Sequence, residues 1–232
     1  MNMDRRQRIR ALLAADHDSV PTLARICALA VSELAVTGTG VVLIDHAGTI
    51  DAQQRLVRAS DDVAARLEDL QLTVGEGPGL TAAATGGAVL VPDLAVEASR
   101  WPAFTQGAQA AGAAAVFAIP LTLGSISLGS LDCYRDTVGR LGPHQVTDAL
   151  LLTEMAFEAV LAEVAGHDAD DLRWISDIHA EVHQASGMLM DHLGIPIHAA
   201  LLRIRGYAYS NDLPVAVVAT QIVRHGLILE RE

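Results

Sequence analysis

Two histidines in the last quarter of the chain, His179 and His183, stand four residues apart. On a helix this spacing places both side chains on one face, where zinc peptidases hold their metal ion. Those enzymes use the pattern HExxH, in which a glutamate directly follows the first histidine. Here the segment reads HAEVH, so Glu181 stands in the wrong place, and no third ligand is evident. The sequence predicts no metal site at these histidines.

A glycine-rich stretch, VGEGPGL at residues 74–80, has the composition of a loop that cradles phosphate. It lacks the lysine of GxxxxGK[ST] and the spacing of GxGxxG, the two patterns typical of nucleotide-binding loops. We therefore interpret the stretch as a structural turn.

No arrangement of nucleophile and base stands out elsewhere. The chain has no GxSxG, no pairing of cysteine with histidine that local sequence supports, and no kinase or HD-type signature. Asp93 and Asp132 fall near predicted strand ends, but nothing marks them as a catalytic pair. Cys27 and Cys133 lie far apart in apolar neighbourhoods, as buried thiols of a reducing compartment do. The sequence predicts neither an enzyme nor a bound cofactor.

Charge is distributed unevenly along the 232 residues. The net charge is −12, and all 16 basic residues are arginines. Residues 172–232 hold five arginines against six acidic residues, a net charge of −1, so residues 1–171 carry −11. A polyanion such as RNA is repelled least by the C-terminal part.

The chain shows no signal for membrane insertion or export. No apolar run approaches the roughly 18 residues of a transmembrane helix. At the N-terminus, arginines are followed by only a short apolar patch and then by acidic residues, unlike a signal peptide. We predict a cytoplasmic protein that does not contact a membrane.

Apolar spacing predicts an α+β domain with an antiparallel sheet flanked by helices over residues 1–165. Alternating or β-branched apolar runs predict the strands, and apolar residues at steps of three and four predict the helices. The predicted strands are 38–45, a strand near Leu56, 88–93, 113–123 and 125–135, and the predicted helices are 20–34, 61–72, 80–85 and 101–111.

A long helix and a small helical domain follow. Residues 143–165 have apolar positions on more than one narrow stripe, so this connecting helix can pack on its own domain and on a partner copy at once. The run GHDADD, residues 166–171, breaks the pattern and is the predicted linker. Residues 172–232 contain three short amphipathic segments, typical of a three-helix bundle.

Two family resemblances cover nearly all of the chain. Residues 20–165 resemble a GAF domain, the ligand-sensing α/β fold, through VGEGPGL, AVLVPDL, RWPAF, AVFAIPL and LGSLDCYRD. Residues 178–229 resemble an ANTAR domain, the RNA-binding module of bacterial antiterminators, through QASGMLM, HAALLRIRGYA and LPVAVVATQIV. The order is similar to that of the GAF–ANTAR regulators of actinobacteria.

Two positions depart from the patterns of these families. Ser186 stands where the commoner ANTAR sequence has a lysine, which removes a phosphate contact. Gly79 stands where many GAF–ANTAR proteins have a cysteine, so a redox role for that cysteine is not available to this chain.

The ANTAR resemblance implies an RNA-binding face. Single-stranded loops are recognised by stacking on aromatic rings or guanidinium groups and by hydrogen bonds to exposed bases. Arg203 and Tyr207 are four residues apart and share a helix face. The alternative is an ordinary solvated face, with Gly187 serving close packing between helices. The candidate RNA-binding residues are Gln184, Ser186, Gly187, Arg203, Arg205 and Tyr207.

The GAF resemblance implies a sensory pocket with VGEGPGL at its mouth. Glu76 in that turn would disfavour an anionic ligand. Trp101, Phe104 and Phe117 are the other candidates for its lining, the alternative being that these aromatic residues belong to the core.

Together these features predict a signal-responsive regulator that binds paired hairpins in nascent RNA and prevents transcription termination. A small-molecule or protein ligand of the GAF-like domain would control it by changing how the long helices pair in a homodimer. The alternative is a dimeric ligand-sensing module that acts through protein partners without binding RNA, which Ser186 and the net charge of −12 favour.

Overall fold

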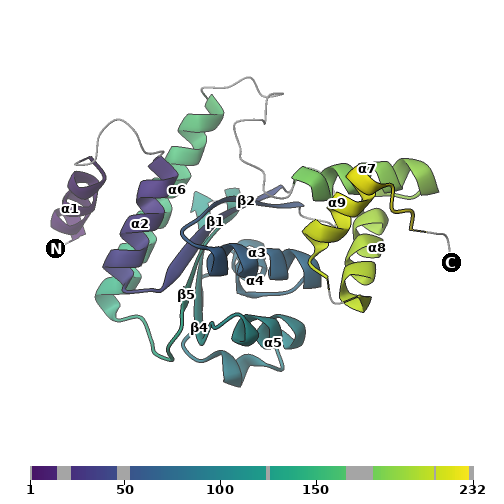
Figure 1. Ribbon diagram of the computed structural model, residues 1–232. Helices are drawn as coiled ribbons and strands as arrows, with labels where there is room; N and C mark the ends of the chain where they lie inside the picture. Colours follow the sequence, from purple (N-terminus) through teal and green to yellow (C-terminus); the bar gives the residue numbers. More distant parts are fainter. Residues whose placement is uncertain are drawn as a thin grey trace.

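A computed structural model describes residues 2–14, 22–45, 53–123, 126–165, 180–211 and 213–229. An antiparallel sheet lies in the middle with helices on both faces, and a separate group of helices lies beside it (Figure 1). We refer to the sheet with helices α1–α6 as the sheet domain, and to helices α7–α9 as the C-terminal bundle. This architecture confirms the predicted α+β class.

The sheet has the strand order β2-β1-β5-β4-β3, and each neighbouring pair is antiparallel. Strand β5, the last along the chain, therefore lies at the centre, between β1 and β4. The strands are β1 (Gly38–Asp45), β2 (Gln53–Ala59), β3 (Val89–Val91), β4 (Ala115–Leu123) and β5 (Ile126–Arg135).

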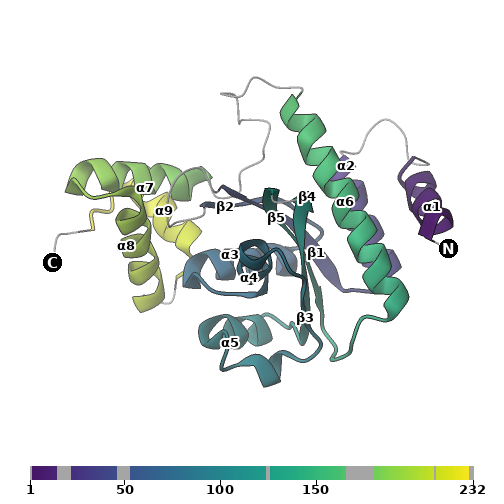
Figure 2. The same cartoon turned by 180° about the vertical axis from the view of Figure 1, so that it is seen from behind.

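Helices α2 (Thr22–Leu34) and α6 (Pro143–Ala165) pack side by side on one face of the sheet (Figures 1 and 2). Every second residue of β4 points toward them, because side chains alternate between the two faces of a strand. The residues of β4 on this side are Ala115, Phe117, Ile119 and Leu121. Helix α6 is the long helix predicted from the sequence. Across the described ranges, no helix combines the length and apolarity needed to cross a bilayer.

The other face is covered by α3 (Asp62–Val74), α4 (Pro78–Thr85) and α5 (Pro102–Ala110), with a 3-10 turn, η1 (Leu94–Glu97), before α5. Helix α3 begins at Asp61, whose carboxylate accepts hydrogen bonds of 2.9 Å from the backbone amides of Val63 and Ala64. It ends at Gly75, whose φ of 72° is a left-handed conformation that glycine adopts without strain.

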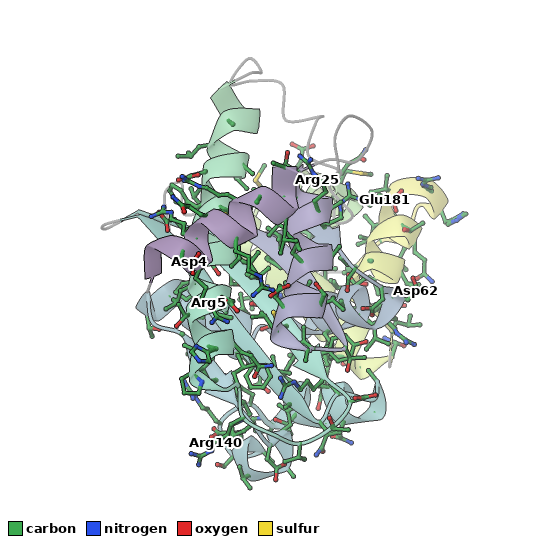
Figure 3. The ribbon with its side chains drawn as sticks, turned by 90° about the vertical axis from the view of Figure 1, so that its left-hand side faces the viewer. Asp4, Arg5, Arg25, Asp62, Arg140 and Glu181 are labelled. Atoms are coloured by element: carbon green, nitrogen blue, oxygen red, sulfur yellow. The ribbon has the colours of Figure 1, made fainter. Side chains whose placement is uncertain are left out.

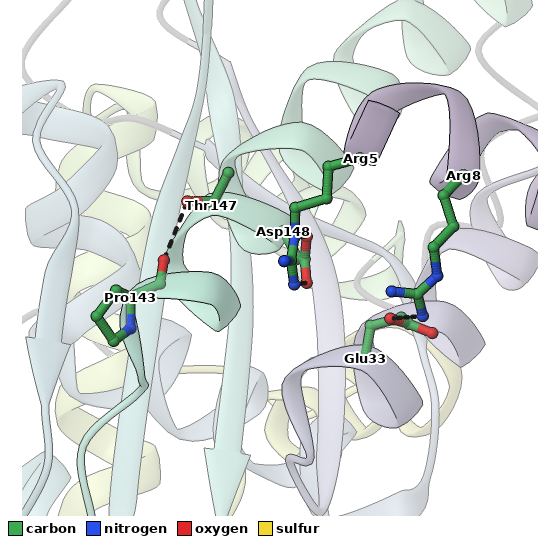
Figure 4. A network of polar contacts seen from close by, with 6 residues as sticks. All are labelled: Arg5, Arg8, Glu33, Pro143, Thr147 and Asp148. Carbon is green, nitrogen blue, oxygen red and sulfur yellow. Dashed lines mark hydrogen bonds and ion pairs between the residues drawn. The ribbon is translucent and has the colours of Figure 1, made fainter. Parts of the chain in front are cut away.

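An N-terminal helix that the sequence analysis did not predict, α1 (Asn2–Ala14), lies against α2 and α6 (Figure 3). Ile9 is its buried apolar anchor. Arg5 donates two hydrogen bonds, of 2.5 and 2.7 Å, to the buried carboxylate of Asp148. Arg8 pairs with Glu33 at 2.6 Å (Figure 4). These ion pairs hold a helix of low apolarity on the acidic surface of its neighbours.

The C-terminal bundle consists of α7 (Ala180–Leu193), α8 (Ile197–Ser210) and α9 (Val215–His225). The three helices bury a shared apolar core, which includes Val182, Leu189, Ile204, Val218 and Ile222. The predicted linker at 166–171 and the beginning of the first predicted bundle helix lie outside the described residues.

The bundle packs on the C-terminal end of α3. Leu72, a residue of α3, is 1% exposed and belongs to the apolar core of the bundle. The Nε of Arg205 donates a 2.7 Å hydrogen bond to the Leu72 carbonyl, and the Val215 amide donates one of 3.2 Å to the Thr73 hydroxyl. One end of one helix therefore joins the two parts of the molecule.

Candidate functional site

A cluster of polar side chains is buried between α3, α4 and the centre of the sheet. Gln71 is its hub, since its Nε2 donates hydrogen bonds to Glu68 at 2.7 Å and to Asp132 at 2.9 Å. The Oε1 of Gln71 accepts a 2.8 Å hydrogen bond from the Gly79 amide. The sequence analysis missed Glu68 and Gln71. Their signal was helical spacing, because they fall on the same face of α3 as the buried Ala64 and Leu67.

Burial shifts the protonation of the two carboxyl groups. It raises the pKa of Glu68 well above its ordinary value, and the neighbouring charge of Asp132 raises it further. Burial also raises the pKa of Asp132, while the hydrogen bond from Gln71 opposes that shift. Two adjacent buried carboxyl groups cannot both ionise at low cost. The pair is therefore expected to hold a proton, and Glu68, whose pKa is raised both by burial and by the charge of Asp132, is the group that we test.

Replacing Glu68 by glutamine, which resembles the neutral acid, is expected to stabilise the protein at alkaline pH. The pKa of Glu68 is higher in the folded than in the unfolded chain. The contribution of Glu68 to stability is therefore fully present below the unfolded pKa of about 4.3, and it is lost as pH rises through the folded pKa. The difference in unfolding free energy between Glu68→Gln and the parent protein should grow from about pH 5 to about pH 9. Urea titrations over that range measure it.

The exposed carboxylate of Asp62 on the same helix provides the control. Asp62→Asn should run parallel to the parent protein across that pH range. A Glu68→Gln curve that also runs parallel would contradict the proton-holding role of Glu68.

Little space surrounds this polar cluster. A cavity of about 10 Å³ borders Glu68, Gln71, Asp132 and Phe104, which is the size of a single water molecule. Asp132 Oδ1 has no hydrogen-bond partner among the residues described. Sites for organic ligands commonly have roughly 300–1,000 Å³. The space beside this polar cluster is therefore too small for such a ligand.

Three of the predicted pocket residues hold local structure together. Glu76 accepts hydrogen bonds from the backbone amides of Ala103 and Phe104, at 2.8 and 3.1 Å, and so caps the beginning of α5. The indole of Trp101 donates a 3.1 Å hydrogen bond to the Thr81 hydroxyl. Trp101 and Phe104 are both buried in the core between α3, α5 and the sheet.

Phe117, the fourth predicted residue, lies on the opposite face of the sheet, in the core with α2 and α6. Its place follows from strand alternation, since Val116 and Ala118 point toward α3 and α5. The four residues therefore do not line one pocket, and of the four only Phe104 borders the small cavity.

A larger pocket, of about 690 Å³, lies between the sheet domain and the C-terminal bundle. Helices α3 and α5 form one wall. The other wall comes from the end of α8 and the turn before α9, with Ala208, Tyr209, Leu213 and Pro214. Its volume falls within the range of small-molecule sites, which often occur between domains.

The candidate RNA-binding residues of α7 differ in accessibility. Gln184 is exposed. Ser186 is 2% exposed, and its hydroxyl donates a 2.8 Å hydrogen bond to the Val182 carbonyl of its own helix. In this arrangement the Ser186 hydroxyl does not reach the surface. Gly187 is half-buried, and a Cβ added there would meet no atom of the described part of the chain within 4 Å.

The candidates of α8 divide between the surface and the contact with α3. Arg203 and Tyr207 are half-buried, and Tyr207 packs against the core of the bundle. Arg205 reaches the Leu72 carbonyl at the end of α3, and burial lowers its pKa. A guanidinium group at a helix C-terminus interacts favourably with the helix dipole. Here Arg205 is engaged within the chain.

The two cysteines and the candidate metal ligands are the remaining reactive groups of the chain. Burial raises the pKa of Cys27 and of Cys133 to about 12, so both thiols stay protonated at neutral pH. This confirms the prediction of buried thiols. In the described part of the chain, no three histidine, cysteine or acidic side chains gather in a way that could hold a metal ion, although His179 lies outside it.

Comparison with solved structures shows which fold the sheet domain resembles. The GAF domain of an Acinetobacter phosphoenolpyruvate-protein phosphotransferase matches with a TM-score of 0.53 and 14% identity, over 73% of this chain and 98% of that one. The sheet domain has a GAF-like fold. No protein-family model matches the sequence, and no curated protein matches it.

Escherichia coli SdiA matches over a longer span than the GAF domain does. Its TM-score is 0.56 at 13% identity, over 98% of this chain and 99% of that chain. The likeness therefore extends from the GAF-like domain into the helices that follow it.

Proposed function

We propose that the chain is a signal-responsive cytoplasmic regulator, not an enzyme, whose C-terminal bundle binds hairpins in nascent RNA and prevents transcription termination. The GAF-like fold supports the sensing half of this function. The ANTAR-like sequence of α7–α9 and their three-helix packing support the RNA-binding half.

The observation that carries the RNA-binding half is the environment of Gly187. Glycine inside a helix costs about 1 kcal/mol relative to alanine, so an interior glycine needs a reason. Close packing against the described residues of the bundle is not that reason, because a Cβ at this position would meet none of their atoms within 4 Å. Gln184, exposed and three residues earlier, shares its helix face. Close approach by a molecule from outside the chain explains the glycine.

Gly187→Ala is expected to stabilise the protein by about 0.5–1 kcal/mol, because alanine favours the helix. The same change should weaken binding to an RNA with two adjacent small-loop hairpins at least tenfold, since the methyl group blocks close approach. Thermal unfolding and fluorescence anisotropy measure the two effects.

Gly142→Ala is the matched control, because that position lies just before α6 and its Cβ would make only an ordinary contact with Gln145. This variant should bind the RNA normally. If Gly187→Ala binds the RNA as tightly as the parent protein does, the environment of Gly187 no longer supports RNA binding by the bundle. Single-hairpin RNA, scrambled RNA and duplex DNA, each at two salt concentrations, separate specific binding from charge attraction.

A homodimer formed through α6 fits this proposal. Leu150 and Leu161 are exposed on α6 and stand eleven residues apart, which places them on one helix face. Two such helices side by side would cover these leucines and would place two bundles in reach of two RNA loops. Sedimentation of the parent protein beside Leu150→Glu tests this step, and the variant is expected to be monomeric.

Exposed apolar side chains on the bundle favour a second candidate, signalling through a protein partner without RNA. Met188 is 44% exposed on α7, and Leu202 is 56% exposed on α8. Exposed methionines and leucines are more typical of protein-binding surfaces than of RNA-binding ones. This candidate would be selected if neither the parent protein nor Leu72→Ala binds RNA at low salt. Leu72→Ala removes the α3 side chain that lies in the core of the bundle.

A further inference from the structure

We propose that the pocket between α3, α5 and the C-terminal bundle binds a small zwitterion of the amino-acid type with an apolar side chain. The pocket has about 690 Å³, enough for an amino acid or a dipeptide. The proposal rests on the sensing half of the proposed function and does not depend on RNA binding.

The floor of the pocket suits an apolar group. Its apolar lining includes Leu70 and Val74 of α3, Ala110 and Ala111 at the end of α5, and Leu213 in the turn before α9. Small residues on α5 leave the space open, while Leu70 packs closely against Gly107, where a Cβ would lie 2.7 Å from its Cδ2. The lining is therefore shaped by tight packing, and its depth comes from alanine and glycine.

Two opposite charges stand beside this apolar floor. Arg66 and Asp69 both line the pocket and are three residues apart on α3, so they project from one face of the helix. A carboxylate would pair with Arg66, and an ammonium group with Asp69. A ligand with both groups and an apolar side chain matches this arrangement better than one with a single charge.

The net charge of the surrounding domain points the same way. Residues 1–171 carry a net charge of −11, which repels a simple anion. A zwitterion has no net charge and is not repelled. Tyr209, 71% exposed at the end of α8, lines the pocket and provides an aromatic face to cover the ligand.

Binding at this place would act on the contact between the two parts of the molecule. The ligand would touch α3 and α5 on one side and the turn before α9 on the other. It would therefore stabilise the packed arrangement, in which Arg205 reaches the Leu72 carbonyl and the Val215 amide reaches the Thr73 hydroxyl. The Val215 amide is a direct reporter, since a first-turn amide has no partner within its own helix.

The test is calorimetric titration of the full chain with L-phenylalanine and with L-phenylalanyl-L-leucine. One of these probes is expected to bind with a stoichiometry of one. Acetylating its amino group or amidating its carboxylate should weaken binding at least tenfold, because each change removes one charge. Saturation with the probe should slow hydrogen exchange of the Val215 amide at least tenfold.

Variants separate this pocket from other sites. Ala110→Trp fills the pocket from the exposed end of α5 and should abolish binding, and Arg66→Ala should weaken it at least tenfold. Arg140→Ala, at an exposed arginine elsewhere on the sheet domain, should bind normally. Circular dichroism confirms that each variant folds.

Three results would overturn the inference: no binding of either probe at millimolar concentration, undiminished binding by Ala110→Trp, or tighter binding of the acetylated probe. Hairpin RNA binding is measured on the same preparation without a probe. If RNA binds while both amino-acid probes fail, the pocket proposal fails and the RNA-binding proposal stands.

Discussion

Replacing Gly79 by alanine is expected to lower the free energy of unfolding by about 2–4 kcal/mol. An added Cβ would lie 1.9 Å from Asp132 Oδ2 and 3.0 Å from the Gln71 amide nitrogen. Neither group can move freely, because Gln71 holds both carboxyl groups of the buried cluster. The variant must break these hydrogen bonds or displace α4 from the sheet. Urea denaturation followed by circular dichroism measures the loss.

Gly206→Ala is the matched control for this prediction. It introduces the same methyl group inside a helix, but at a position where a Cβ would meet none of the described residues within 4 Å. It should stabilise the protein by up to about 1 kcal/mol. The double variant Gly79→Ala/Asp132→Ala should lose less unfolding free energy than the two single variants lose together, because removing the Asp132 carboxylate removes the clash. Unchanged stability of Gly79→Ala would contradict the geometry of the cluster.

Leu72→Ala is expected to release the C-terminal bundle from the sheet domain. The side chain of Leu72 lies in the core of the bundle although its backbone belongs to α3, and truncation of a buried leucine costs about 2–5 kcal/mol. This loss of free energy weakens the contact between the sheet domain and the C-terminal bundle. Hydrogen exchange of the Val215 amide should become fast, and unfolding should separate into two transitions.

The matched control is Leu67→Ala on the same helix, because Leu67 faces the sheet. It should destabilise the sheet domain and leave the exchange of the Val215 amide slow. Release of the bundle in Leu72→Ala also frees Arg205 from its contact with α3. If that contact keeps Arg205 from RNA, this variant should bind hairpin RNA more tightly than the parent protein. An unreleased bundle in Leu72→Ala would show that other contacts hold it.

Local pattern predicted most of the elements, and the short connections predicted the two hairpins, β1 with β2 and β4 with β5, but not how the hairpins join. The β-branched run at 38–45 and the strand predicted at 125–135 correspond to β1 and β5, yet nothing in either segment says that they are neighbours. Pairing depends on the packing of helices on both faces. Likewise the apolar spacing of α3 did not reveal that Leu72 belongs to a different core from Leu67, because that depends on contacts with residues 110 or more positions away.

The candidate site shows the same limit. Glu68 and Gln71 have the composition of a solvated helix face, and only their position on the buried side of α3 makes them a polar cluster. The aromatic residues Trp101 and Phe117 were grouped by type, but strand alternation separates them by the thickness of the sheet. Residue type alone does not give this information.

The central position of β5 determines how long one edge of β1 stays unpaired during synthesis on the ribosome. Strand β1 pairs with β2 on one side, but its other edge waits for β5, which begins 80 residues after β1 ends. At roughly 5–20 residues per second, that edge is exposed for about 4–16 seconds while the intervening helices emerge. An unpaired apolar strand edge invites aggregation during that interval. Slow codons between the two strands would lengthen this exposure, and recoding that segment for faster translation should raise the yield of folded protein.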